Sequence, residues 1–206
     1  MKVLLVNGSP HKNGCTFTAL SEVAKALTQD GIETEFFHIG TGAVHGCTAC
    51  GACQKLGHCV FTDDPANALS EKMQEADGIV IGSPVYYAGA NGALCALLDR
   101  AFYSGHGFAF KPAAAVVSAR RSGTTATFDR LNKYFTINRM PIVSSQYWNG
   151  VHGHCPEDVM QDLEGLQTMR NAAKCMAWML KCFEAGKAQN IALPDTKKEV
   201  STNFIR

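Results

Sequence analysis

The sequence predicts an α/β fold, a doubly wound parallel sheet of five strands with helices on both faces. Two observations lead to this prediction. Strand-like and helix-like hydrophobic patterns alternate five times along the 206 residues. The strand over residues 78–82 is apolar throughout, as expected for a parallel strand that is covered on both faces. Right-handed crossovers then leave few topologies, and ligands of such sheets bind beyond the carboxyl ends of the strands.

The first elements are a strand over residues 3–6 and a helix. The helix has an apolar face at helical spacing, formed by Phe17, Leu20, Ala24 and Leu27. Residues 33–39 follow Gly31 and are typical of a second strand. Residues 40–64 form a long connection rich in glycine and cysteine. A connection of this length without evident secondary structure is often functional.

A second helix is expected to begin with Asp64 as N-cap and Pro65 in its first turn, because these residue types favour those positions. The apolar strand over residues 78–82 follows it. Residues 83–91 are expected to form a loop. The helix after this loop buries one face, formed by Leu94, Leu97, Leu98 and Phe102.

The second half of the chain continues the alternation. A strand is expected over residues 113–117, followed by a polar loop over residues 118–123 and a helix. We expect the fifth strand at residues 141–143. The last long helix is expected to begin near Pro156, because acidic residues follow this proline and are favoured in a first turn.

Composition and charge narrow the function classes. An apolar fraction of 46% supports a sizeable core, which we expect in one domain over residues 1–186, followed by an extended tail over residues 187–206. The formal net charge of +1 gives no bias toward nucleic acid, and no apolar run is long enough to span a membrane. The N-terminus lacks a signal-peptide pattern, and nine cysteines without one indicate a reducing, cytoplasmic location.

The loop after the first strand, residues 7–16, has the features of a phosphate site. It joins a strand to a helix N-terminus, where unpaired amides and the helix dipole favour an anion. Ser9, Asn13 and Thr16 add side-chain donors, and two glycines allow close approach of the backbone. The loop has neither the Gly-Lys-Ser/Thr of a P-loop nor the Gly-x-Gly-x-x-Gly of a dinucleotide fold. An ordinary strand–helix turn that binds nothing is the alternative.

The loop over residues 83–91 suits a planar heteroaromatic ligand. Pro84 and the glycines present backbone groups at fixed angles, and Tyr86 and Tyr87 offer flat faces for stacking. The alternative is a pair of surface tyrosines on an ordinary loop. The two loops support each other, because the first and third strands adjoin where the strand order of a doubly wound sheet reverses.

These two loops, together with Asp99 and Arg100, resemble the NAD(P)H-dependent FMN reductases of flavodoxin-like fold, over residues 1–145. The resemblance implies the strand order 2-1-3-4-5 and a bound FMN. It implies that the phosphate binds at Ser9, His11, Asn13, Cys15 and Thr16, the isoalloxazine ring at Pro84, Val85, Tyr86 and Tyr87, and the pyrimidine side of the ring at Ser118, Arg120 and Gly123. Cys15 departs from the family, which usually has Asn or Ser there, and this puts one phosphate contact in question.

The long connection carries four thiols within 13 residues, at Cys47, Cys50, Cys53 and Cys59. Such spacing suits a zinc ion or an iron–sulfur cluster. It is similar to that of the iron–sulfur flavoproteins, a branch of the same family, and residues 202–206 also resemble tails in that branch. The resemblance implies a [4Fe–4S] cluster beside FMN, while zinc, free thiols and a redox disulfide stay open. Cys95, Cys175 and Cys182 fall in helical patterns and are expected to be buried.

The resemblance implies an oxidoreductase that passes electrons from NAD(P)H through FMN to a small-molecule acceptor such as a quinone, flavin, nitro or azo compound. The flavin supplies the chemistry, so no catalytic side chain is expected. Arg120 and Arg121 are expected to attract the phosphate of NADPH, to stabilise the reduced ring, or to be solvated. The alternatives are an electron carrier that uses FMN, a cluster and a ferredoxin-like partner, and a zinc-bound interaction module. The resemblance also implies a homodimer or homotetramer.

Overall fold

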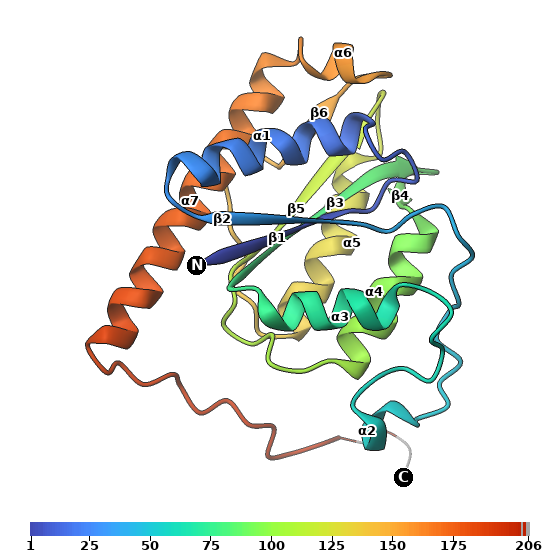
Figure 1. The fold of residues 1–206 in the computed structure, drawn as a ribbon, viewed down its shortest axis with the longest axis vertical. Helices are drawn as coiled ribbons and strands as arrows, with labels where there is room; N and C mark the ends of the chain where they lie inside the picture. The colour runs from blue at the N-terminus through green and yellow to red at the C-terminus, as the bar shows by residue number, and fades with distance from the viewer. Residues whose placement is uncertain (203, 205–206) are drawn as a thin grey trace.

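A mainly parallel sheet forms the centre of the molecule (Figure 1). The computed structural model describes residues 1–202 and 204, and within them the sheet has six strands. The parallel strands lie in the order β2-β1-β3-β5-β6 and are β1 (Lys2–Asn7), β2 (Glu33–His38), β3 (Gly78–Tyr86), β5 (Ala113–Ala119) and β6 (Gly150–His152). Counted along the chain without the short β4 (Gly89–Ala90), this is the order 2-1-3-4-5. The prediction of a doubly wound, flavodoxin-like sheet is confirmed.

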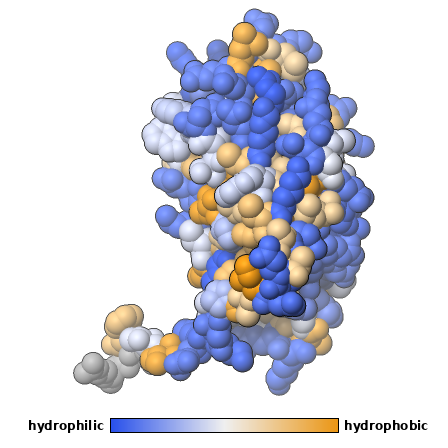
Figure 2. All heavy atoms as spheres, turned by 90° about the vertical axis from the view of Figure 1, so that its left-hand side faces the viewer, coloured by the Kyte–Doolittle hydropathy of each residue, from blue (hydrophilic) through white to orange (hydrophobic). Residues whose placement is uncertain are grey.

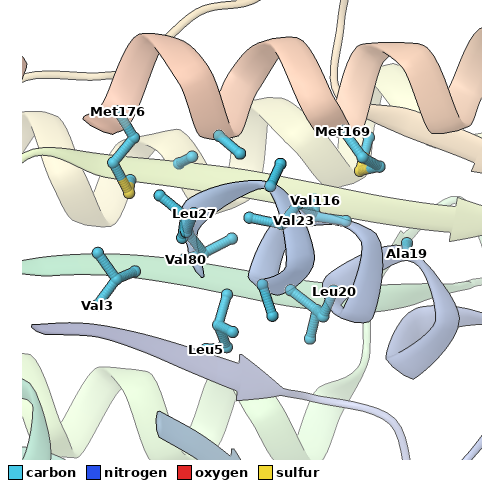
Figure 3. Close-up of a cluster of buried hydrophobic side chains, with 14 of the residues drawn as sticks. Val3, Leu5, Ala19, Leu20, Val23, Leu27, Val80, Val116, Met169 and Met176 are labelled. Atoms are coloured by element: carbon cyan, nitrogen blue, oxygen red, sulfur yellow. The ribbon is translucent and has the colours of Figure 1, made fainter. Parts of the chain in front are cut away.

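Helices cover both faces of the sheet, because each strand points alternate side chains to opposite sides. The helices are α1 (Cys15–Gln29), α3 (Ala66–Glu75), α4 (Gly92–Ser104), α5 (Thr124–Ile137) and α7 (Leu163–Ala188). Val3, Leu5 and Val80 pack on one face with α1 and α7, as Figure 3 shows. Leu4 and Ile79 pack on the other face with α3, α4 and α5. The helices do not cover the carboxyl edge of the sheet, where the loops that follow the strands lie.

The fifth parallel strand lies later in the chain than predicted. The prediction of a strand at residues 141–143 is wrong: in the described part of the chain, Ile142 makes an isolated bridge to Ala113, and regular pairing with β5 begins at β6. The segment between them is irregular because Asn149 turns inward, where its Nδ2 donates to the Ala115 carbonyl at 3.1 Å. The short apolar run at residues 141–143 is therefore apolar because it packs against the core, and it does not form a regular strand.

The last long helix, α7, also begins later than predicted. Residues Pro156–Val159 form the separate short helix α6. Asp162 then caps α7, because its Oδ1 accepts a hydrogen bond from Gly165 N at 2.9 Å and its Oδ2 accepts one from His152 N at 2.7 Å. Asp162 thus bonds both to β6 and to α7, and the chain turns between them. The acidic residues Glu157 and Asp158 lie in the first turn of α6 and not of α7.

Strand β3 extends into the segment predicted as a loop. Residues 83–84 pair with β5, and residues 85–86 then form a hairpin with β4. Tyr87 and Ala88 make the two-residue turn with φ of 49° and 57°, as in a type I′ turn. Residues other than Gly, Asn and Asp rarely adopt positive φ, so this turn is strained, and such strain collects at functional sites.

The long connection after β2 is irregular, as expected, apart from the four-residue helix α2 (Cys53–Leu56). It ends at α3, where the structure has Pro65 as the N-cap. Asp64 Oδ1 still accepts a hydrogen bond from Ala66 N at 3.1 Å, so the cap is one residue later than predicted while the carboxylate keeps its contact with the first turn.

Beyond α7 the chain continues as an extended tail that projects from the body of the molecule, at the lower left of Figure 2. The expected similarity of residues 202–206 falls largely on residues 203, 205 and 206, which lie outside the described residues. Cys175 and Cys182 are exposed and Cys95 is half-buried, so the prediction that the three are buried is wrong. Cys175 and Cys182 lie on α7 outside its buried stripe, and Cys95 lies on α4. Among the described helices, none has the length and apolar character needed to cross a membrane.

Candidate functional site

The loops after β1 and β6 and the ends of β3 and β5 line a cavity of about 590 Å³ at the carboxyl edge of the sheet. This edge of the sheet lies at the upper right of Figure 1. Except for Tyr87 and Gly123, the residues expected to bind the cofactor all line the cavity: Ser9, His11, Asn13, Cys15, Thr16, Pro84, Val85, Tyr86, Ser118 and Arg120. The loop over residues 7–16, predicted to bind the phosphate (the phosphate loop), and the segment over residues 83–91, predicted to bind the ring (the ring loop), therefore share one cavity. Its volume lies within the range of small-molecule sites, about 300–1,000 Å³.

The first turn of α1 lines this cavity. Gly14 is the N-cap and, as a glycine, has no side chain to bond the first-turn amides. These amides and the positive end of the helix dipole are therefore available to an anion. The loop before α1 is held by its own hydrogen bonds: Ser9 Oγ accepts from His11 N at 3.1 Å, and Asn7 Oδ1 accepts from Ser9 N at 3.1 Å. Ser9 can still donate its hydroxyl proton to a ligand.

The close approach of the phosphate loop to the ring loop depends on Gly8. Its N–H donates to the Gly82 carbonyl at 2.9 Å, and Asn91 Nδ2 donates to the Gly8 carbonyl at 2.7 Å. A Cβ at Gly8 would lie 2.4 Å from Leu94 Cδ2 and 2.6 Å from the Gly82 oxygen. A larger residue would therefore push the phosphate loop away from β3 and α4.

Thr16 and Cys15 form part of the cavity wall with their side chains already engaged. Thr16 Oγ1 and Ser118 Oγ lie 2.8 Å apart and both residues are buried, so this hydrogen bond ties α1 to the end of β5. Cys15 Sγ donates to the Gly153 carbonyl across 3.8 Å. Burial raises the pKa of the Cys15 thiol, so the group stays neutral near pH 7 beside a site that suits an anion.

The ring side of the cavity is formed by Pro84 and Tyr86, with Tyr86 43% exposed. Tyr87 lies at the tip of the β3–β4 hairpin, fully exposed and outside the lining. Gly123 also lies outside it, with φ of 91°, and a Cβ there would come within 2.8 Å of Ala88 Cα. Gly123 therefore packs beneath the hairpin that carries Tyr86.

The sequence patterns do not predict the remaining side of the cavity. It is formed by Gly153, His154 and Cys155 of the loop between β6 and α6 and by Pro156, the first residue of α6. Gly153 N donates to the Ala119 carbonyl at 3.0 Å, which holds this loop against β5. With the fifth strand predicted at residues 141–143, the loop that follows it is expected near residue 144, so these residues are not expected to line the cavity. The Gly-His-Cys-Pro sequence shortly after the apolar Val151 is the signal that would have found them.

A second and much smaller pocket, of about 20 Å³, lies in the long connection. Its lining includes the whole predicted metal set, Cys47, Cys50, Cys53 and Cys59. All nine cysteines lie in the described residues as free thiols, and thiolates suit both zinc and iron–sulfur clusters, so the donor set fits such a group. Within the described residues no three His, Cys, Asp or Glu side chains are grouped as metal ligands, so the loop would have to close on the group.

Arg100 of α4 holds this cysteine-bearing connection. Its side chain is 1% exposed and forms an ion pair with Asp64, whose side chain is 0% exposed. Its Nε donates to Cys59 Sγ at 3.2 Å, and its Nη atoms donate to the carbonyls of His45 and Phe61, both at 3.1 Å. Burial alone would raise the pKa of Asp64, but hydrogen bonds from Arg100 and from backbone amides outweigh it and lower this pKa. The sequence singles out Arg100 as part of a motif and does not predict these contacts.

Comparison with known sequences gives matches along nearly the whole chain. A family model described as NADPH-dependent FMN reductase matches residues 1–154. An iron–sulfur flavoprotein of Methanocaldococcus jannaschii is 34% identical over 193 residues, which cover 89% of this chain and 100% of that protein. An iron–sulfur flavoprotein of Methanosarcina thermophila is 29% identical, over 91% of this chain and 99% of that protein.

Solved structures of similar fold are more distant in sequence. A flavone reductase has a TM-score of 0.69 at 18% identity, covering 89% of this chain and 64% of that chain. RosB with a bound 8-demethyl-8-formylriboflavin-5′-phosphate has a TM-score of 0.68 at 14% identity, covering 100% of this chain and 92% of that chain. Similarity at this level of identity shows the fold alone. Since the family model matches residues 1–154 and a relative is 34% identical along its full length, the chain belongs to the NADPH-dependent FMN reductase family.

Proposed function

We propose that this protein is an FMN-dependent oxidoreductase that passes electrons from NAD(P)H through FMN to a small-molecule acceptor such as a quinone, flavin, nitro or azo compound. The observation that carries the proposal is the shared cavity of about 590 Å³, which has an open helix N-terminus at one end and Pro84 and Tyr86 at the other. Bound FMN would supply the hydride-accepting ring. The chain would bind that ring, orient it and exclude water from one of its sides.

The residues that would hold FMN come from both ends of the cavity. The first-turn amides of α1, with Ser9, His11 and Asn13, would bind the phosphate. The segment over residues 84–86 would lie against the isoalloxazine ring. The end of β5, with Ser118 and Arg120, would meet the pyrimidine side, where Arg120 would stabilise negative charge on the reduced ring.

Anaerobic reduction of the FMN-loaded protein tests this function. We expect NADPH or NADH to abolish the visible absorbance of the flavin within one turnover, and a quinone to restore it. Steady-state oxidation of the nucleotide should then depend on the acceptor concentration. A loaded protein that is reduced by dithionite but by neither nucleotide would contradict the proposal.

The four thiols that line one pocket favour a second candidate function. In it, the protein is an electron carrier in which the cysteines hold a [4Fe–4S] cluster and electrons pass between FMN, the cluster and a ferredoxin-like partner. The 34% identical relative, which is named an iron–sulfur flavoprotein, supports this candidate. Iron, zinc and acid-labile sulfide assays after anaerobic purification test it. A flavin-loaded protein without iron that oxidises NADPH rapidly would exclude it.

We further propose that the protein acts as a homodimer or homotetramer in the reducing cytoplasm. The extended tail after α7, which exposes Leu193 and Val200, supports an assembly in which a second subunit covers apolar side chains. Light scattering of the purified protein tests the assembly, and a monomer at micromolar concentration would contradict it.

A further inference from the structure

We propose that Arg100 is a positioning residue for the group held by the cysteines: it fixes Cys59 as the immobile thiol of the set and hydrogen-bonds its sulfur. The inference rests on the second proposed function, since it concerns the group that the four cysteines would hold. It extends that function by assigning a residue that is not a ligand but fixes the position of one ligand and donates a hydrogen bond to its sulfur.

Cys59 is held from two helices. Its backbone N–H donates to Asn67 Oδ1 of α3 at 2.9 Å, and Asn67 Nδ2 donates back to the Cys59 carbonyl at 2.9 Å. Its sulfur accepts the hydrogen bond from Arg100 Nε of α4 at 3.2 Å. Cys47 and Cys50, in contrast, are exposed on an irregular segment. One thiol is therefore fixed in place, and the exposed thiols can close on a group that is bound to it.

The planar guanidinium of Arg100 also joins the two ends of the connection. It donates to the carbonyls of His45 and Phe61 and pairs with Asp64. Its Cζ lies 5.4 Å from the centre of the Phe61 ring, and the His45 ring stacks on Phe61 at 4.5 Å. A lysine has the same charge but a single ammonium group, so it cannot reach these acceptors and the sulfur of Cys59 together.

The hydrogen bond to sulfur has an electrostatic consequence. The charge of Arg100 is balanced by the buried carboxylate of Asp64, so the pair brings little net charge into the site. The Nε–H dipole, however, points at the Cys59 sulfur and favours added negative charge there. Hydrogen bonds to cluster sulfurs set the reduction potential, and a donor at this position raises it.

Redox titration of the reconstituted protein tests the proposal. Wild type, R100K and R130K are reconstituted anaerobically with iron and sulfide and titrated with dithionite, with electron paramagnetic resonance as the readout. R130K is the matched control, because Arg130 pairs with Asp99 in a half-exposed position away from the cysteine connection. In R100K we expect about a tenfold lower ratio of reduced to oxidised cluster at a given potential, which is about 59 mV for one electron. R130K should match the wild type.

Equal potentials in all three proteins, or an equal shift in R130K, would overturn the proposal. If R100K does not fold, the double variant D64N/R100Q, which removes both buried charges together, should show the same lowered potential. If the wild type takes up no iron, the proposed cluster function is wrong. Hydrogen exchange of the cluster-free protein then tests separately whether Arg100 holds Cys59 in place. The amides of residues 59–61 should then exchange at least tenfold faster in R100K than in R130K, and equal exchange would refute the positioning role.

Discussion

The cavity of about 590 Å³ that we propose binds FMN, here called the flavin cavity, and the cysteine-bearing connection over residues 40–64 are built in opposite ways. The cavity lies on the ends of parallel strands, and short backbone contacts such as Gly8 N to the Gly82 carbonyl hold its loops. The connection is irregular and carries two exposed thiols, Cys47 and Cys50. Its order depends on contacts with α3 and α4, above all the buried ion pair of Arg100 and Asp64.

The two kinds of construction should differ in how sensitive they are to the loss of one side chain. A site on strand ends inherits its geometry from the sheet, so one lost side chain disturbs it locally. A site on an irregular loop depends on the few residues that hold the loop, so one lost side chain can release all of it. The two regions should therefore respond differently to single substitutions.

The largest effect is expected for Asp64→Asn. It leaves the charge of Arg100 buried without its partner, and breaking a buried pair in this way costs about 3–5 kcal/mol of unfolding free energy. Urea denaturation of the cofactor-free protein measures this loss. Glu75→Gln, which breaks half-exposed ion pairs, is the control and should change stability little. FMN affinity of the folded Asp64→Asn protein should be unchanged; equal stability of the two variants would contradict this comparison.

Gly8→Ala should damage the flavin cavity and spare the connection. The added Cβ would meet Leu94 and the Gly82 carbonyl, and such overpacking costs about 1–3 kcal/mol of unfolding free energy. We expect FMN affinity, measured by quenching of flavin fluorescence, to fall at least tenfold. Gly42→Ala is the matched control, since a Cβ there meets nothing within 4 Å among the described residues. Wild-type affinity in Gly8→Ala would show that the close approach is unnecessary.

A smaller effect is expected for the hydrogen bond between Thr16 and Ser118. A double-mutant cycle with Thr16→Val and Ser118→Ala should give a coupling of about 0.5–1.5 kcal/mol in unfolding free energy. The same bond joins α1 to β5 across the cavity, so each single variant should also bind FMN several-fold more weakly. A coupling of zero would mean that α1 and the end of β5 are held together by other contacts.

The smallest effect concerns the pH dependence of stability. Burial raises the pKa of Cys15 in the folded protein, so the folded state holds this proton more tightly than the unfolded chain does. Its contribution to stability is complete below the pKa of the unfolded thiol and is lost as the pH rises above about 9 toward the folded pKa. The difference in unfolding free energy between wild type and Cys15→Ser should therefore shrink above that pH. A difference that stays constant would contradict burial of the thiol.

The parts predicted from sequence are those with local signatures. Alternating hydrophobic patterns predicted the sheet, and the residues that follow β1 and those at the end of β3 predicted two sides of the cavity. The fifth strand was misplaced because β6 has three residues and its position depends on Asn149, whose inward bond to the Ala115 carbonyl has no local pattern. The loop with Gly153 and His154 was missed for the same reason.

The contacts of Arg100 could not be predicted for a different reason. Arg100 lies 41 residues from Cys59 and 55 from His45 along the chain, so these contacts arise only when α4 and the connection pack together. The exposure of Cys175 and Cys182 likewise follows from which stripe of α7 meets α1 and the sheet. A helical pattern alone does not reveal how wide that stripe is.

The affinities of the cofactor-free protein for FMN and for riboflavin test most directly whether one cavity holds both ends of a flavin nucleotide. The two ligands share the ring and differ in the phosphate that the first turn of α1 would bind. We predict that FMN binds with one-to-one stoichiometry and at least about 100-fold more tightly than riboflavin, a difference of about 2.7 kcal/mol. Equal affinity for the two ligands, or no binding of either, would contradict the account.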